Sequence, residues 1–187
     1  MKHVLFVLAA CLCAIFIVSF ASQAAEKAPT KVLDLANGEL AALGRDPVIV
    51  AAVKDKNARG ETLDQVKALD QTWRDTPGLA DFMLPLMKNP CALHIKELQE
   101  KSPYFLEIFI MDHQGAIVAM TEKTSDYWQG DEAKFQNSHK EGRGEVFVDD
   151  IKFDDSAQSY LVQVSVPVMD QDRAIGAITF GIDVDKL

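Results

Sequence analysis

The sequence predicts an α+β fold in which N-terminal helices precede a five-stranded antiparallel sheet. Two changes along the chain support this class. Apolar residues recur at helical spacing over residues 31–98, and after Pro103 they follow the pattern of β-strands. The chain is long enough for one domain with its own core. The domain is predicted at residues 25–187, with a helical part at 28–101 and a sheet part at 104–185.

Capping residues divide the helical part. Asp46 before Pro47 predicts a helix start, with the aspartate as N-cap and the proline at the first helical position. Thr62 with Gln65 three residues later forms a capping-box pattern. The expected helices run from about 31 to 43, from 47 to 57, from 63 to 75, from 79 to 88 and from 93 to 100.

The sheet part contains five β-rich runs separated by turn residues. The first two form a hairpin around the turn at 112–115, and the last two are joined by the turn at 170–172. A polar crossing at 122–143 is expected to be a loop with a short helix. The expected strands are 105–111, 116–121, 145–153, 159–168 and 174–183.

The first 24 residues have the pattern of an export signal. Lys2 precedes an apolar run at 4–21, and small residues at 22–24 suit cleavage there, which would leave a periplasmic or otherwise extracytoplasmic protein. The run is also just long enough for an uncleaved inner-membrane anchor. A lipoprotein-like box at 8–11 is a third alternative. Each alternative places the domain beyond the membrane.

Charge and cysteine content exclude several classes of protein. Beyond the leader, 28 acidic residues face 18 basic ones, a net charge of −10 that disfavours nucleic acid and anionic membranes as partners. Cys91 is the single cysteine there, so no disulfide can form within the domain. The three remaining histidines are dispersed and predict no zinc site, and no cofactor is expected.

No catalytic motif is present, so we expect no enzymatic activity. The sequence lacks a Gly-x-Ser-x-Gly elbow and a glycine-rich phosphate loop. Cys91 and His94 share a predicted helix start, where a thiol can be activated. A half-buried structural thiol is the favoured interpretation of Cys91.

The crossing at 122–143 holds the strongest candidate for a binding site. Adjacent Tyr127 and Trp128 lie between Asp126 and Asp131, and rings of this size are rarely left in water. The rings and carboxylates could cover a cavity against the sheet. Equally, the rings could be a lid on the core while the acids cap a helix. The spacing leaves both interpretations open.

A second acidic group surrounds a strand end, at Asp149, Asp150, Asp154 and Asp155. These carboxylates could bind a divalent cation such as calcium. No Asp-x-Asp-x-Asp-Gly loop is present, so a solvated turn is favoured over a metal site.

Several segments together resemble the extracytoplasmic PAS-like sensor domains known as Cache or PDC domains, in their single-module form. The run from Asp126 to Glu132 is the most specific of them. The resemblance covers nearly the whole chain after the leader. The other matching segments are 46–49, 57–58, 70–73, 103–108, 112–115, 153–156, 164–168 and 175–178.

This resemblance implies a small-molecule pocket between the sheet and the crossing at 121–144. It places Asp126, Tyr127, Trp128 and Asp131 on the pocket loop, and Asp154 or Asp155 where an acid can face a ligand amine. Amino-acid-binding members resemble an Arg-x-Trp-Tyr arrangement, whereas no arginine is adjacent here. A ligand with a positive group is therefore favoured.

The expected function is that of an exported sensory module that binds an amine, an amino acid or an organic acid and has no output domain of its own. It would present its ligand to a separate membrane receptor or kinase, or act alone. A homodimerisation or protein-interaction module with a vestigial pocket is one alternative. A divalent-cation binder is another.

Overall fold

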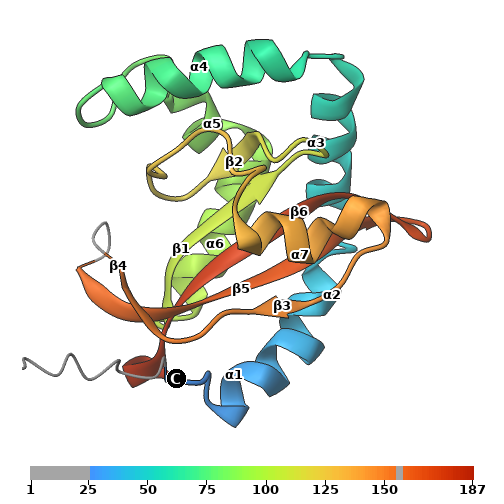
Figure 1. The fold of residues 1–187 in the computed structure, drawn as a ribbon. Helices are drawn as coiled ribbons and strands as arrows, with labels where there is room; N and C mark the ends of the chain where they lie inside the picture. Colours follow the sequence, from blue (N-terminus) through green and yellow to red (C-terminus); the bar gives the residue numbers. More distant parts are fainter. Residues whose placement is uncertain (1–25, 155–157) are drawn as a thin grey trace, which may run out of the picture.

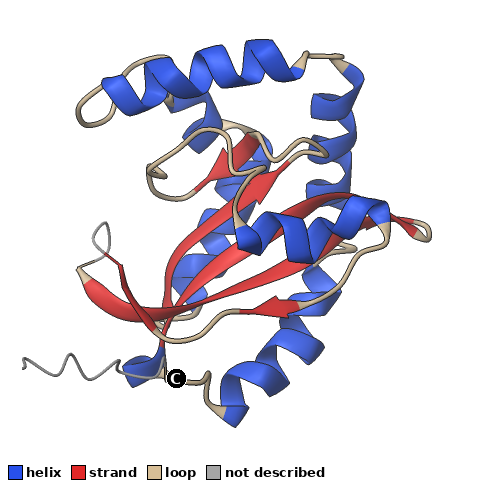
Figure 2. Cartoon of the chain, in the orientation of Figure 1, coloured by secondary structure: helices blue, strands red, loops and turns tan. Residues whose placement is uncertain are grey.

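The computed structural model describes residues 26–154 and 158–187. One antiparallel sheet runs through the molecule and helices lie against both of its faces (Figures 1 and 2). The predicted leader lies outside the described residues, so its three alternatives and the domain boundary stay predictions. Among the helices of the described ranges, none has the length and apolar character needed to cross a membrane.

The helices begin where the sequence places caps. Asp46 Oδ1 accepts hydrogen bonds from the backbone N–H of Val48 at 2.8 Å and of Ile49 at 3.2 Å, and Thr62 with Gln65 forms the predicted capping box. The helical segments are α1 (Thr30–Leu35), π-helical η1 (Ala36–Leu40), α2 (Ala41–Leu43), α3 (Pro47–Ala58), α4 (Leu63–Asp75), α5 (Leu84–Lys88), α6 (Pro90–Lys101), α7 (Ala133–His139), η2 (Lys140–Gly142) and η3 (Val184–Lys186).

Two helices differ from their predicted bounds. The helix expected at 79–88 is shorter, because the segment before Leu84 forms a turn. The helix expected at 93–100 begins at Pro90, because the Asn89 side chain accepts from the Ala92 N–H at 2.8 Å and caps an earlier start.

The strands confirm the predicted α+β class and its antiparallel sheet. The order is β2-β1-β6-β5-β3, and β4 also pairs with β5. The single strand expected at 145–153 is two short strands on the same partner, interrupted where the Ile151 N–H bonds the carbonyl of Glu26 instead. The bounds are β1 (Phe105–Met111), β2 (Ile117–Met120), β3 (Phe147–Val148), β4 (Lys152–Asp154), β5 (Ser159–Asp170) and β6 (Arg173–Asp183).

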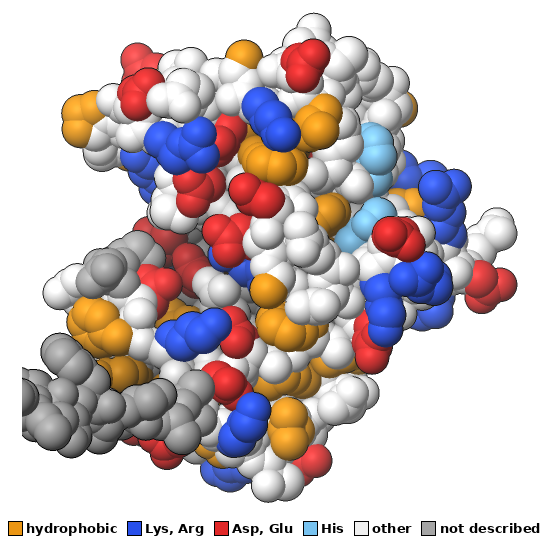
Figure 3. All heavy atoms as spheres, viewed as in Figure 1, with side chains coloured by type: hydrophobic (Ala, Val, Ile, Leu, Met, Phe, Trp, Pro, Cys, Tyr) orange, Lys and Arg blue, Asp and Glu red, His pale blue; other side chains and the backbone are white. Residues whose placement is uncertain are grey.

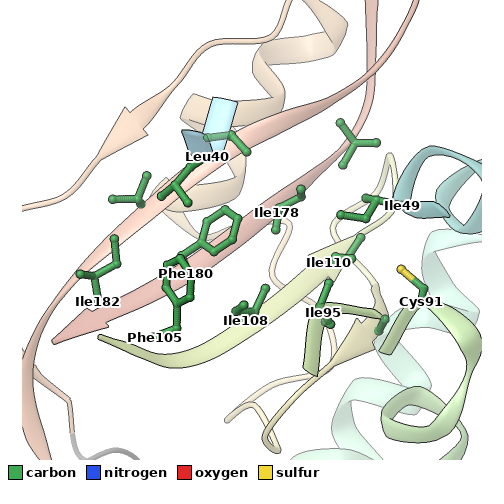
Figure 4. Close-up of a cluster of buried hydrophobic side chains, with 14 of the residues drawn as sticks. Leu40, Ile49, Cys91, Ile95, Phe105, Ile108, Ile110, Ile178, Phe180 and Ile182 are labelled. Carbon is green, nitrogen blue, oxygen red and sulfur yellow. The ribbon is translucent and has the colours of Figure 1, made fainter. Parts of the chain in front are cut away.

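One face of the sheet is apolar and is covered by α1, η1, α3 and α6. Figure 4 shows part of this cluster, in which isoleucine and phenylalanine side chains of β1 and β6 meet helical residues. Burial of these side chains is the main stabilising contribution in this half of the molecule. Its labelled members are Leu40, Ile49, Cys91, Ile95, Phe105, Ile108, Ile110, Ile178, Phe180 and Ile182.

The other face carries both apolar and polar side chains. At one end Phe109 and Met111 pack with Trp73 and Tyr127 in a second cluster. Toward the other end this face carries the polar residues Glu107 of β1 and Gln163 of β5, and helix α7 lies over the middle (Figure 1). The candidate site lies where this face of the sheet changes from apolar to polar.

Candidate functional site

The candidate site is built on a cross-strand row of the mixed face. Glu107 of β1 lies opposite Gly181 of β6, which in turn lies opposite Gln163 of β5. The Glu107 side chain is buried although it is an acid, and Gln163 Nε2 donates to its Oε1 at 3.4 Å. Glycine between the two polar residues leaves the carboxylate room to lie across the sheet.

Two adjoining hollows open over this row. A small one of about 60 Å³ is lined by Glu107, Gln129 and neighbouring residues, and a larger one of about 270 Å³ extends along α7 and β4. Figure 3 shows a recess on the left of the molecule, between the loop after β2 and the β4–β5 region, with acidic side chains gathered around it. Both hollows are lined by Lys134, Asp154 and Gln163.

The buried carboxyl group of Glu107 is the central charged group of the small hollow. Burial raises the pKa of Glu107 above its ordinary value, and the negative charge of Asp154 raises it further. Lys134 and the hydrogen bond from Gln163 act in the opposite direction. Lys134 Nζ also lies 5.6 Å from the centroid of the Phe109 ring.

The loop above the hollows presents an acceptor rather than donors. Thr124 Oγ1 and Gln129 Nε2 both donate to the carbonyl oxygen of Asp126, at 2.7 and 2.8 Å. The amide oxygen Oε1 of Gln129 is buried and accepts no hydrogen bond from any described residue. A buried acceptor without a donor is costly. The site therefore complements a group that donates hydrogen bonds.

Helix α4 holds this loop from the side away from the hollows. Asp70 Oδ1 accepts from the backbone N–H of Tyr127 at 2.9 Å and of Trp128 at 3.0 Å. Trp73 Nε1 donates to the carbonyl of Thr124 at 2.8 Å. Asp70 is itself buried and pairs with Arg74 at 2.8 Å. The loop is thus fixed by Asp70, a buried acid that the sequence analysis placed in a matching segment but not in the candidate site.

The predicted aromatic pair is divided between two environments. The Tyr127 ring is 2% exposed and packs against Trp73 at 5.7 Å between ring centroids, so the space beneath it is filled by core side chains. Trp128 is partly exposed, and its indole N–H donates to the carbonyl of Gln114 at 2.8 Å. Lys67 Nζ lies 4.4 Å from the Trp128 ring centroid. Neither ring lines the two hollows.

The predicted acids also lie in different places. Asp126 faces Arg74 at 3.6 Å, and Asp131 is exposed. Asp154 lines both hollows and so joins Glu107 in the candidate site. Asp155 lies outside the described residues. A role in binding stays a prediction for all of these residues.

Sequence reasoning missed the residues that form the floor and wall of the hollows. They are Glu107, Gln129, Lys134 and Gln163. One signal was available for Glu107, an acid within the apolar strand Phe-Leu-Glu-Ile-Phe-Ile-Met. Nothing local marks the others, because their meeting depends on how the crossing folds back over the sheet.

The two other candidates from the sequence are the Cys91–His94 pair and the second acidic group. Cys91 is buried, which raises the pKa of its thiol to about 12, and Asp46 contributes to this rise. His94 is directed to Asp46, with 3.1 Å between Nε2 and Oδ2. For the second acidic group, no set of three His, Cys, Asp or Glu residues in the described ranges is arranged to hold a metal ion.

Comparison with known proteins finds similarity among solved structures. No protein-family model and no curated protein matches the sequence. The V. cholerae histidine kinase DctB sensor domain is 11% identical, with a TM-score of 0.44 over 84% of this chain and 51% of that one. The ligand-binding domain of the Campylobacter jejuni chemoreceptor Tlp3, in complex with 4-methylisoleucine, is 14% identical, with a TM-score of 0.43 over 74% and 55%.

A third match is the ligand-binding domain of Mlp24 with asparagine, at 18% identity and a TM-score of 0.38 over 80% and 61% of the two chains. This chain thus spans less than two thirds of each matched structure. All three are sensor or ligand-binding domains by name.

Proposed function

We propose that this protein is a non-enzymatic sensory module that binds a small primary amine or amino acid in the hollows over Glu107. One observation carries the proposal: Gln129, whose buried amide oxygen Oε1 accepts no hydrogen bond from a described residue, lines the same hollow as the buried acid Glu107. An ammonium group has three N–H donors and a positive charge, so it suits both acceptors together.

The ammonium group would lie in the small hollow, which is lined by Glu107, Asp154 and Gln129. The body of the ligand would extend into the larger hollow along α7. Lys134 lines both hollows and would offer a partner to a ligand that also carries a carboxylate. This arrangement favours amines and amino acids over simple organic acids, because acidic side chains outnumber basic ones around the two hollows.

Thermal-shift screening followed by calorimetry tests the proposal. The panel contains primary amines, amino acids and organic acids without an amine. We expect at least one amine to stabilise the protein, by about 2.7 kcal/mol at a hundredfold excess over Kd. Glu107→Gln should abolish this stabilisation, because the replacement keeps the shape and removes the charge.

Glu100→Gln is the matched control, because Glu100 is exposed and lines neither hollow. It should leave binding unchanged. Binding of organic acids alone, or amine binding that survives Glu107→Gln, would reject the proposal.

Export and a separate signalling partner belong to the same proposal. A sensory module beyond the membrane would pass its ligand state to a receptor or kinase, and its leader would be removed or retained as an anchor. Intact mass of the protein from the producing cell would decide between these outcomes, because cleavage before Ala25 removes residues 1–24.

A further inference from the structure

A third cavity lies on the opposite side of the sheet from the acidic hollows. Its volume is about 410 Å³, and it is a groove between α3 on one side and α5 with the start of α6 on the other. Val118 of the edge strand β2 contributes to its lining, together with buried Cys91. We call it the α3 groove. It belongs to the layer that packs on the apolar face, so it shares no lining residue with the candidate site.

The walls of the α3 groove are apolar. Ala51 and Ala52 are small, so α3 leaves open space, and Pro85 and Leu86 face it from α5. Val48 at the edge is 39% exposed. Small-molecule sites are concave and mostly apolar with a few polar groups. By this criterion the groove fits a ligand better than the acidic hollows do, and no part of the proposed function uses it.

One end of the groove is polar and contains a buried cation. Lys56 is 6% exposed, and its Nζ donates to Glu61 Oε2 at 2.6 Å and to the Tyr127 hydroxyl at 2.9 Å. A lysine ammonium has three donors, so these two bonds leave one N–H. Burial is the largest single influence on the pKa of Lys56 and lowers it, but the bonds to Glu61 and Tyr127 outweigh burial and the pKa is raised. The side chain therefore stays charged.

Arg59 adds a second cation at this end. It is the C-cap residue of α3, is exposed, and forms no ion pair with a described residue. Asp55 also lines the groove and is the one acid among its lining residues. Glu61 pairs with Lys56 and offsets its charge, so Arg59 is the cation at this end that can bind an anionic group.

We propose that the α3 groove binds a compact apolar carboxylate, with its carboxylate at Lys56 and Arg59 and its apolar body between α3 and α5. The apolar walls account for the body and the remaining Lys56 donor for one carboxylate oxygen. A guanidinium can bind the same carboxylate with two parallel hydrogen bonds. The proposal is independent of amine binding, because the two sites differ in place and share no lining residue.

Calorimetry with octanoate and benzoate tests the proposal, with octanol and benzyl alcohol as neutral counterparts. Ala51→Leu places a larger side chain in the groove, and leucine keeps a high helix propensity. Ala58→Leu is the matched control, because Ala58 is exposed on the same helix and does not line the groove. We expect at least one carboxylate to bind wild type, at least tenfold weaker binding in Ala51→Leu, and a change of less than twofold in Ala58→Leu.

Arg59→Gln tests the contribution of the positive charge separately from that of the apolar walls. It should weaken carboxylate binding several-fold and leave binding of the alcohols unchanged. The proposal is overturned if neither carboxylate binds wild type, if the alcohols bind equally well, or if Ala51→Leu binds like Ala58→Leu. Light scattering tests whether a second copy of the chain occupies the groove instead. If wild type self-associates and Ala51→Leu does not, the groove is a contact between two copies, and the proposal is overturned.

Discussion

Glu107 lies in space that Gly181 leaves open. A Cβ atom built on Gly181 would stand 2.7 Å from Cγ of Glu107, closer than two carbon atoms can approach. The two residues are direct cross-strand neighbours on β1 and β6. A side chain at position 181 would therefore move the carboxylate that the proposed site depends on.

Gly181→Ala should weaken amine binding and destabilise the fold. The new methyl group forces the Glu107 side chain or the strand to shift, at a cost of about 1–3 kcal/mol. Chemical denaturation measures the stability, and calorimetry with the amine found in the screen measures the affinity. An alanine variant with wild-type affinity would show that Glu107 need not lie across position 181 to bind.

The stability of the protein should depend on the ionisation of Glu107. Its pKa is higher in the folded state than the value of 4.5 for an unperturbed glutamate, so folding favours its protonated form. The contribution of protonated Glu107 to the stability of the fold is complete below the unfolded pKa and is lost as pH rises through the folded pKa. Glu107→Gln should thus be more stable than wild type at pH 7, with a difference that disappears near pH 4.

Denaturation of both proteins across this pH range checks the prediction, because the other carboxylates titrate equally in the two and cancel. Each unit of pKa difference corresponds to about 1.4 kcal/mol. A difference in stability that stays constant with pH would show that Glu107 does not titrate in this range.

Amine affinity should fall as the pH is lowered through the raised pKa of Glu107. A protonated carboxyl group has no negative charge to offer an ammonium ion, so binding would compete with a proton. Calorimetry in buffers of different ionisation enthalpy should detect proton release on binding. Affinity independent of pH between 4 and 8 would contradict ion pairing with Glu107.

Asp70→Ala should loosen the loop that carries Gln129. The change leaves the buried N–H of Tyr127 and the N–H of Trp128 without their acceptor, at about 1–3 kcal/mol for a buried group. We expect faster amide hydrogen exchange at both positions and unchanged exchange in the β5–β6 pair. Asp75→Ala, which removes an exposed acceptor of Gln71 on the same helix, is the control and should change neither.

Cys91 should be unreactive in the folded protein. Burial and a thiol pKa of about 12 leave very little thiolate at pH 8. Iodoacetamide should therefore label the native protein far more slowly than the protein in denaturant. Rapid labelling of the native state would show that the start of α6 opens readily.

Much of the secondary structure could be predicted because its signals are local. A cap such as Asp46 or Thr62 bonds N–H groups two or three residues away, so a short stretch of sequence contains both partners. The β1–β2 hairpin and the β5–β6 turn follow from turn residues in the same way. The division between β3 and β4 could not be predicted, since it depends on the bond from the Ile151 N–H to the distant carbonyl of Glu26.

The candidate site could not be predicted, because its residues lie far apart in the sequence. Tyr127 and Trp128 attract attention as adjacent rings, but which of them is buried depends on Asp70, more than fifty residues earlier in the chain. Glu107, Gln129 and Gln163 come together from two strands and a loop. Their separation along the sequence leaves no periodic pattern to read.

By itself the sequence determined the fold class, the helix starts and the acidic, disulfide-free character of the domain, because these follow from composition and from contacts between near neighbours. Only the tertiary structure decided where a cavity remains. Cavities are what is left after distant side chains have packed, and the hollows over Glu107 and the α3 groove both arise between elements that meet only in the folded protein.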